Sequence, residues 1–427
     1  MSNLTEYQRE NLMLLVGTNT VPNYVAARML ASDGKTLVHL VSSNEMVGGG
    51  MQEALIKVLE RTGHRLAEPV IVDPVNPDDI CAKVRGRVLA TSGSWGLHYT
   101  GGKKIMATHA YRAMETALAT RVPPEEGVYS YLDADSLTLV IDPLEGRPVG
   151  PIAAHQNPEA EIRLTLADLL ELQGESERTL KKVRWSEYPA GELDRRTLSG
   201  PKRPHRVPFR PEVRRSLLTA WMGDGREAMK AWRDKGLKAA GGPSLVPACV
   251  PEIGGEDLAT LAAKWGETVK HLQGWFHGNW LEDYVLDLVR GIADTCKLTD
   301  YALGLEPDLW RPQAPNEHFE CDVLVTQGYR LFYISVTTDD SNALCKSKLF
   351  EAYLRAQRLG GDEADAALVT FHPNSARLQR EIREAHGSKA KVRVFGPEHL
   401  FDRDRQELRL AESLVDWFAS PKRRSND

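Results

Sequence analysis

The first 120 residues alternate short apolar runs with stretches of helical spacing, and this alternation most limits the folds open to the chain. The apolar runs are residues 12–17, 36–43 and 69–73, and helical spacing follows each of them. Buried parallel strands joined by amphipathic helices give this pattern, because helices then cover both faces of the sheet. The sequence therefore predicts an N-terminal α/β domain over residues 1–150.

Small hydrogen-bonding residues stand where the first two strands are expected to end. Thr18 and Asn19 follow the first apolar run, and Ser42 and Asn44 lie at the end of the second. Ligands of parallel α/β sheets bind beyond the carboxyl ends of the strands, so these side chains are candidates for a binding site. The segment VGTNTVPNY after the first run lacks the GxGxxG pattern, which argues against a dinucleotide cofactor.

A glycine-lysine loop at residues 100–104, TGGKK, opens a stretch of helical spacing that runs to about residue 119. Glycines at a helix start expose backbone N–H groups, and the helix dipole favours an anion there. With the charges of Lys103 and Lys104 the loop suits a phosphate, although it does not follow the Walker A pattern. A plain turn into a helix with two solvated lysines is the alternative interpretation.

A hairpin nearer the C-terminus is the second informative region, with strands expected at 319–326 and 331–338. A two-residue loop between them places Asp322 directly opposite Ser335. Because side chains alternate between faces, one face of the hairpin is expected to carry Glu320, Asp322, Ser335 and Thr337.

This face suits phosphodiester hydrolysis, which needs oxygen ligands for a divalent ion, an activated water and positive charge near the leaving oxygen. Asp322 is the central candidate. Glu282, in a helical stretch before the hairpin, and Glu320 are the further carboxylates expected to hold Mg2+ or Mn2+. This layout resembles that of PD-(D/E)xK nucleases, in which the second strand carries an acid and a lysine, but here the corresponding positions are Ser335 and Thr337.

A helical stretch after the hairpin offers the missing groups. Lys348 and Glu351 are three residues apart and share a face, whereas Lys346 lies about half a turn away, so one of the two lysines is expected to face the site. Two alternatives remain open: an inactive scaffold that kept its fold, and a Lys348–Glu351 surface ion pair of little energetic weight. The candidate catalytic residues are Asp322, Glu282, Lys346, Lys348 and Glu351.

Length and charge divide the chain further. At 427 residues it exceeds a single typical core, and we expect a connector at 151–265 and a second domain at 266–427. Residues 181–238 carry 16 Lys or Arg against 7 Asp or Glu, a local charge of +9 that leaves −14 for the rest of a chain whose net charge is −5. This basic, proline-rich stretch is either a phosphate-facing surface or a solvated linker.

Five scattered cysteines without CxxC spacing fit reduced thiols in the cytoplasm better than disulfides or a zinc site. No apolar run is long enough to span a bilayer, and the N-terminus lacks an export pattern. We therefore expect a cytoplasmic protein with no membrane partner.

Two motifs carry a family resemblance. The loop TGG-K-K-x-M at the start of a helix resembles that of CARF domains, the sensor domains of type III CRISPR systems, over residues 10–145. GNWLEDYV, the hairpin and KSKLFEAYLRAQRLGG resemble the nuclease domain of CARF–PD-(D/E)xK ancillary nucleases over residues 275–372. The resemblance implies a Rossmann-like CARF domain followed by a restriction-endonuclease-like α/β domain with a mixed sheet.

The resemblance also implies a function. Members of this family form homodimers that bind a cyclic oligoadenylate, here expected to be cyclic tetra-adenylate, across the two-fold axis, and ligand binding switches on metal-dependent cleavage of DNA or RNA. The alternatives are a ligand-sensing regulator with a degenerate nuclease domain, and a nucleotide-dependent enzyme that uses the N-terminal sheet alone. By position, the residues implied to line the ligand site are Thr18, Asn19, Ser42, Asn44, Thr100, Gly101, Gly102, Lys103 and Met106.

Overall fold

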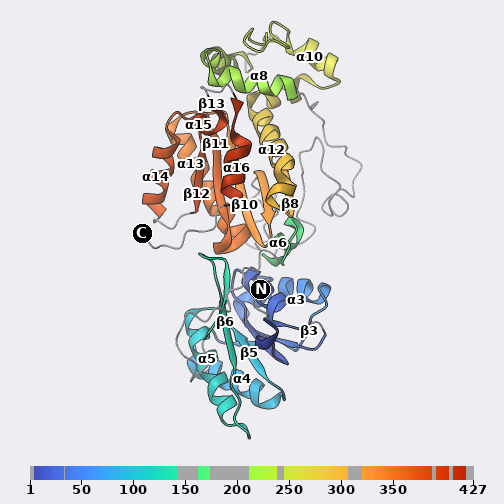
Figure 1. Ribbon diagram of the computed structural model, residues 1–427, viewed down its shortest axis with the longest axis vertical. Helices are drawn as coiled ribbons and strands as arrows, with labels where there is room; N and C mark the ends of the chain where they lie inside the picture. The colour runs from blue at the N-terminus through green and yellow to red at the C-terminus, as the bar shows by residue number, and fades with distance from the viewer. Residues whose placement is uncertain are drawn as a thin grey trace.

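The computed structural model describes residues 4–32, 34–142, 162–173, 211–237, 245–305, 320–386, 391–402 and 407–419. Two α/β units follow one another along the long axis, the N-terminal unit at the bottom of the view and the C-terminal unit above it (Figure 1). Residues 181–210, which make up most of the basic stretch, lie outside the described residues.

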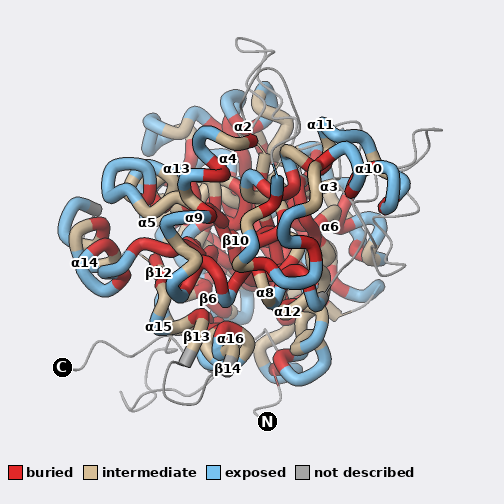
Figure 2. Tube along the Cα trace, turned by 90° about the horizontal axis from the view of Figure 1, so that it is seen from above, coloured by how far each residue is buried: buried red, intermediate tan, exposed pale blue. Residues whose placement is uncertain are grey.

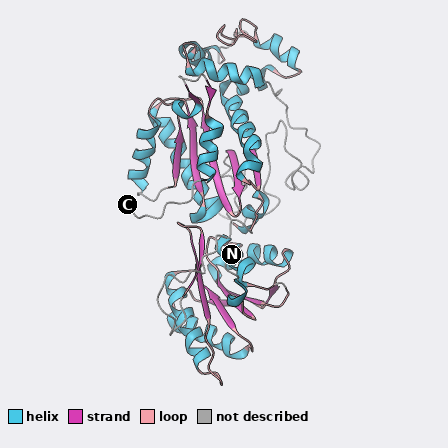
Figure 3. Ribbon diagram, in the orientation of Figure 1, coloured by secondary structure: helices cyan, strands magenta, loops and turns pink. Residues whose placement is uncertain are grey.

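The N-terminal unit is a mostly parallel sheet with helices on both faces, as the alternation of apolar runs predicts (Figure 3). Its described strands are β1 (Asn11–Leu15), β2 (Leu37–Ser43), β3 (Arg65–Leu66), β4 (Val70–Val72), β5 (Trp95–His98), β6 (Val128–Asp133) and β7 (Thr138–Ile141). The order is β3-β2-β1-β5-β6-β7, with β4 also paired to β2. Neighbouring strands run parallel except β6 and β7.

The side chains of β1 alternate between two hydrophobic clusters, one on each face of the sheet. Leu12 and Leu14 pack with α1 and α3, whereas Met13 and Leu15 pack with α4 and α5. The helices of this unit are η1 (Leu4–Tyr7), α1 (Val21–Leu30), α2 (Asn44–Gly48), α3 (Met51–Arg61), α4 (Pro77–Ala90) and α5 (Lys104–Ala119).

The C-terminal unit is built on a mixed sheet. Its strands are β8 (Asp300–Leu305), β9 (Cys321–Gln327), β10 (Arg330–Thr337), β11 (Asp365–Thr370) and β12 (Val392–Phe395), in the order β12-β11-β10-β9-β8. β8, β9 and β10 pair antiparallel, and β10, β11 and β12 pair parallel. A short pair, β13 (Phe401–Asp402) and β14 (Glu407–Leu408), stands apart.

Helices cover both faces of this sheet. α12 and α16 pack on one face, and α13 packs on the other, over β10 and β11. The helices are α12 (Trp280–Cys296), α13 (Asn342–Gly360), η6 (Gly361–Glu363), α14 (Ser375–His386), α15 (Pro397–Leu400) and α16 (Leu410–Ala419).

A helical segment caps the end of the C-terminal sheet that lies farthest from the N-terminal unit (Figure 1). The indole of Trp221 stacks on Phe371, which follows β11, with ring centroids 5.1 Å apart and an interplanar angle of 5°. This helical segment, which contains residues 211–237 and 245–265 of the predicted connector, is thus docked on the C-terminal sheet. It comprises α8 (Pro211–Met222), α9 (Arg226–Ala231), η4 (Trp232–Gly236), α10 (Leu258–Trp265), α11 (Val269–Gly274) and η5 (Trp275–Asn279).

A short helix, α6 (Leu166–Leu172), lies where the two units meet. The N–H of Leu164 donates to the carbonyl of Gly328 at 2.8 Å, and the N–H of Leu166 donates to Asp300 at 3.0 Å. One hydrophobic cluster runs from the N-terminal sheet through α6 to the C-terminal sheet. Figure 2 shows the buried residues gathered along the middle of the molecule, with exposed helices around them.

α6 begins after Thr165, whose hydroxyl and Asp168 form a capping box. All five cysteines are unbonded thiols. None of the described helices has the length and apolar character needed to cross a bilayer.

Candidate functional site

The loop after β5 lies directly against the end of β1. A Cβ atom on Gly101 would come within 2.0 Å of the carbonyl oxygen of Leu15. Gly102 has a φ of 76°, in the left-handed region that favours glycine. Both glycines are therefore required for the two backbones to approach, and the loop opens α5 at the predicted position.

Lys103 reaches from this loop toward the start of α2. Its Nζ lies 3.6 Å from Oε2 of Glu45, and the side chains of both residues are largely exposed. The side chain of Thr100, in the loop after β5, is fixed to β6, because its hydroxyl accepts a hydrogen bond of 2.6 Å from the N–H of Leu132. A cationic side chain thus stands at the surface beside the first turn of α5, where the helix dipole favours an anion.

The other residues implied for the ligand site differ in accessibility. Thr18 and Asn44 are exposed. Ser42 is fully buried, and its hydroxyl has no hydrogen-bond partner among the described residues. Met106 is 2% exposed and packs in the core between α5 and the sheet, so in this structure it supports the loop from below and does not reach the surface.

Asn19 lies at the contact between the two units. Its Nδ2 donates to Oε2 of Glu363 in η6 at 2.9 Å. Its Oδ1 accepts from the side chain of Gln173 at 3.2 Å and from the N–H of Val21 at 3.2 Å. Of the two donors and two acceptor sites of the amide, these bonds occupy three.

Two buried histidines stand in the strands behind this edge. Nε2 of His39 lies 3.1 Å from Oδ1 of Asn11, and Nδ1 faces the guanidinium of Arg87 at 3.4 Å, so the ring is neutral with its proton on Nε2. Burial, with Arg87 adding to it, lowers the pKa of His39 to about 4. His98 bonds Ser130 through Nδ1 at 3.1 Å, and burial lowers its pKa to about 3.

β9 and β10 pair in the predicted register, and the described ladder ends at Val323 opposite Ile334. Beyond that pair the carboxylate of Asp322, in place of a backbone carbonyl of β9, accepts the hydrogen bonds from β10. Its Oδ2 accepts from the N–H of Val336 at 2.6 Å and from the hydroxyl of Ser335 at 3.0 Å. The predicted juxtaposition of Asp322 and Ser335 is confirmed, and the strands diverge at the carboxylate.

The structure decides which lysine faces the hairpin. Nζ of Lys348 donates to the carbonyl oxygen of Val336 at 3.5 Å, so Lys348 and Asp322 meet at the same residue of β10. Lys346 instead forms an ion pair of 2.6 Å with Glu381 on α14. That contact with Lys346, and a second with Arg377, lowers the pKa of Glu381 to about 2. Lys348 is thus the lysine at the candidate site.

Glu351 lies on the outer side of α13. Its carboxylate pairs with Arg355 at 3.2 Å, with 49% of the Glu351 side chain exposed, and accepts from Ser347 at 3.2 Å. Arg355 itself turns toward the hairpin, where it donates to the carbonyl of Glu320 at 3.3 Å and to the hydroxyl of Tyr333 at 3.4 Å. Sequence reasoning missed Arg355, although its spacing of seven from Lys348 places both on one helix face.

The described carboxylates do not assemble the predicted three-carboxylate metal site. Glu282 is 9% exposed in the first turn of α12, and the described residues contain no group of three or more His, Cys, Asp or Glu side chains able to hold a metal ion. Asp322 is the carboxylate at the point of strand divergence. Mg2+ often binds only one or two carboxylates and completes its coordination shell with water and phosphate oxygens. Asp322 fits a site of this kind, with few protein ligands.

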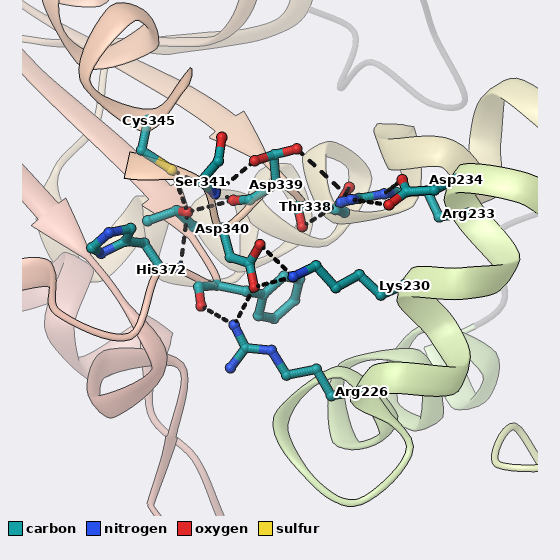
Figure 4. Close-up of polar contacts among 12 residues, drawn as sticks. Arg226, Lys230, Arg233, Asp234, Thr338, Asp339, Asp340, Ser341, Cys345 and His372 are labelled. Atoms are coloured by element: carbon teal, nitrogen blue, oxygen red, sulfur yellow. Dashed lines mark hydrogen bonds and ion pairs between the residues drawn. The ribbon is translucent and has the colours of Figure 1, made fainter. Parts of the chain in front are cut away.

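Two further acids, Asp339 and Asp340, were missed by sequence reasoning and follow β10 (Figure 4). Asp340 pairs with Arg226 at 2.8 Å and with Lys230 at 2.9 Å. Burial raises the pKa of Asp340, but the hydrogen bonds from Lys230 and Arg226 outweigh burial and lower it overall. Arg233 donates to the carbonyl of Thr338 at 2.8 Å. These contacts fix the helical segment to the strand end beside Asp322.

Comparisons with solved structures place this arrangement among known folds. Protein VC1899 from Vibrio cholerae superposes with a TM-score of 0.61 at 16% identity, over 96% of this chain and 97% of its own. Can2 from Sulfobacillus thermosulfidooxidans, solved with cyclic tetra-adenylate, gives a TM-score of 0.61 at 14% identity, over 96% of this chain and 99% of its own. The chain has the fold of Can2.

This likeness covers both units, so the predicted α/β fold is confirmed: a Rossmann-like sheet in the N-terminal unit is followed by a second unit with a mixed sheet. No protein-family model and no curated protein matches the sequence. The identities to the two solved structures are low enough that the likeness speaks for the fold alone.

Proposed function

We propose that the protein is a cyclic oligoadenylate-activated nuclease of type III CRISPR defence. The observation that carries the proposal is the meeting of Asp322 and Lys348 at Val336, where the hairpin strands diverge. A carboxylate bonded to the N–H of one residue and an ammonium group bonded to its carbonyl provide a base and a positive charge at one place. The proposal also rests on the shared fold with Can2, whose structure contains cyclic tetra-adenylate.

The sensing part of the proposal concerns the edge of the N-terminal sheet. Lys103 and the first turn of α5 offer a charge and free backbone N–H groups, which suit the phosphates of a cyclic tetra-adenylate. Thr18 and Asn44 are exposed at strand ends of the same sheet. A homodimer that holds one ring between two such edges is the proposed sensing state.

The cleavage part assigns roles to two residues. Asp322 bonds the protein through Oδ2, and its Oδ1 is the atom proposed to orient and deprotonate the attacking water. As the water oxygen bonds to phosphorus, the P–O bond to the leaving oxygen breaks, and the ammonium of Lys348 stabilises the extra negative charge on the phosphoryl oxygens. Mg2+ or Mn2+ at Asp322 would supply further charge neutralisation when bound.

The test is incubation of the full-length protein with cyclic tetra-adenylate, Mn2+ and a mixed panel of single- and double-stranded DNA and RNA. The proposal expects fragments from at least one nucleic acid only when the ring is present. It is abandoned if the protein binds the ring yet leaves every member of the panel intact. Repeating the reaction with excess chelator measures the metal requirement separately.

A second candidate function is a ligand-sensing regulator without catalysis. The observation that favours it is the chemistry of β10, which presents Ser335 and Thr337 where an acid and a lysine would complete the site. This candidate expects ring binding with no cleavage under any metal condition.

A further inference from the structure

We propose that the hydrogen bond between Asn19 and Glu363 transmits ligand binding from the sensor edge to the cleavage site through α13. The inference rests on the proposed function and names how that site is regulated. α13 contacts the candidate cleavage site through Lys348 near its beginning, and its end contacts the loop that follows β1, called here the sensor loop.

The end of α13 is in close contact with the loop that follows β1. Gly361, which terminates the helix with a φ of 68°, has no room for a side chain, because a Cβ there would lie 1.9 Å from Nδ2 of Asn19. Two residues later the carboxylate of Glu363, 1% exposed, accepts the hydrogen bond from that same nitrogen. A movement of the loop therefore displaces the end of the helix.

α13 holds both strands of the hairpin, through Lys348 near its beginning and Arg355 in its second half. Lys348 bonds the carbonyl of Val336 in β10, and Arg355 bonds the carbonyl of Glu320 at the entry to β9. These two side chains bracket the point at which the strands part around Asp322. Lys348 lies 13 residues from Gly361, about 20 Å along a continuous helix, so a shift at one end is delivered to the other without a flexible joint.

Asn19 is the point at which a ligand can change this contact. Its amide already uses three of four hydrogen-bonding positions, toward Glu363, Gln173 and Val21. The position left over is the second N–H of Nδ2, the same atom that bonds Glu363. A ligand oxygen that binds there changes the geometry of the bond to Glu363, and a ligand shifts an equilibrium only through such a difference in contacts between states. Other described links between the units are those of Arg61 with Asp168 and Glu171, of the Thr20 hydroxyl with the carbonyl of Leu172, and of Lys391 with the carbonyl of Ala134.

The test is amide hydrogen exchange on the full-length protein with and without cyclic tetra-adenylate. In the wild-type protein we expect cyclic tetra-adenylate to change the amide exchange rates about fivefold or more in two regions. These are the sensor loops, residues 17–19 and 100–104, and the segment 342–363. In Glu363→Ala the loops respond and 342–363 does not. Glu363→Gln, which keeps an acceptor for Asn19, behaves as wild type.

Each other outcome overturns the inference. If the wild-type loops respond while 342–363 stays unchanged, the coupling fails and sensing stands. If 342–363 still responds in Glu363→Ala, the contact is not the transmitter. If the loops themselves do not respond, the proposed sensing function fails, and the inference fails with it. If the alanine variant does not fold, the wild-type measurement still decides whether the two regions are coupled.

Discussion

Replacing Lys348 by alanine separates catalysis from folding. Its Nζ makes a long bond, 3.5 Å, to one carbonyl, so its loss leaves the hairpin register, which is set by the backbone ladder and the bonds of Asp322, intact. Removing one preorganised charge that faces a developing oxyanion costs about 10²–10³ in kcat, or about 2.7–4 kcal/mol. We expect a loss of that size in kcat for ring-stimulated cleavage, with the melting temperature of wild type.

Lys346 provides the matched control, since it stands two residues away on the same helix and pairs with Glu381 instead. Lys346→Ala is expected to keep the wild-type cleavage rate. The assay measures initial rates of fragment release at saturating cyclic tetra-adenylate, together with thermal melts of all three proteins. Equal losses in the two variants, or a wild-type rate in Lys348→Ala, would refute the assignment of Lys348.

Two further predictions concern the sensor unit. Gly101→Ala places a methyl group against the carbonyl of Leu15, so we expect a loss of about 1–3 kcal/mol in the free energy of unfolding, measured by denaturant titration; an unchanged midpoint would contradict the close approach. Burial depresses the pKa of His98 to about 3 and of His39 to about 4 in the folded state, below the ordinary value of 6.5. Below pH 6.5 the unfolded chain therefore binds more protons than the folded chain. The contribution of each histidine to the free energy of unfolding is fully present above pH 6.5. It falls by up to about 1.4 kcal/mol per pH unit as the pH drops toward the folded-state pKa. His98→Asn should flatten that slope in denaturant titrations across the same range, and an unchanged slope would show that His98 is not responsible.

The elements with strong periodicity were predictable. The apolar runs place the N-terminal strands, and the TGG loop opens α5 where expected, because glycine is needed at the contact of Gly101 with Leu15. The hairpin register was also predictable from the sequence, because a two-residue loop between the strands places Asp322 opposite Ser335.

The long-range polar contacts were not predictable from one sequence. The choice between Lys346 and Lys348 depends on where α14 places Glu381, which helical spacing does not reveal. The ion pairs of Arg226 and Lys230 with Asp340 were also not predictable. These residues are more than a hundred positions apart and meet only because the helical segment docks on the sheet.

The central claim is that binding of a cyclic oligoadenylate switches on hydrolysis at Asp322, and the rate of strand cleavage in wild type and Asp322→Asn tests it most directly. The amide keeps an acceptor for the N–H of Val336 while it removes the charge. At saturating cyclic tetra-adenylate and Mn2+, we expect ring-dependent fragments from wild type and at least a 10²-fold slower rate, about the loss of one catalytic group, from the variant. Equal rates in the two proteins would contradict the account.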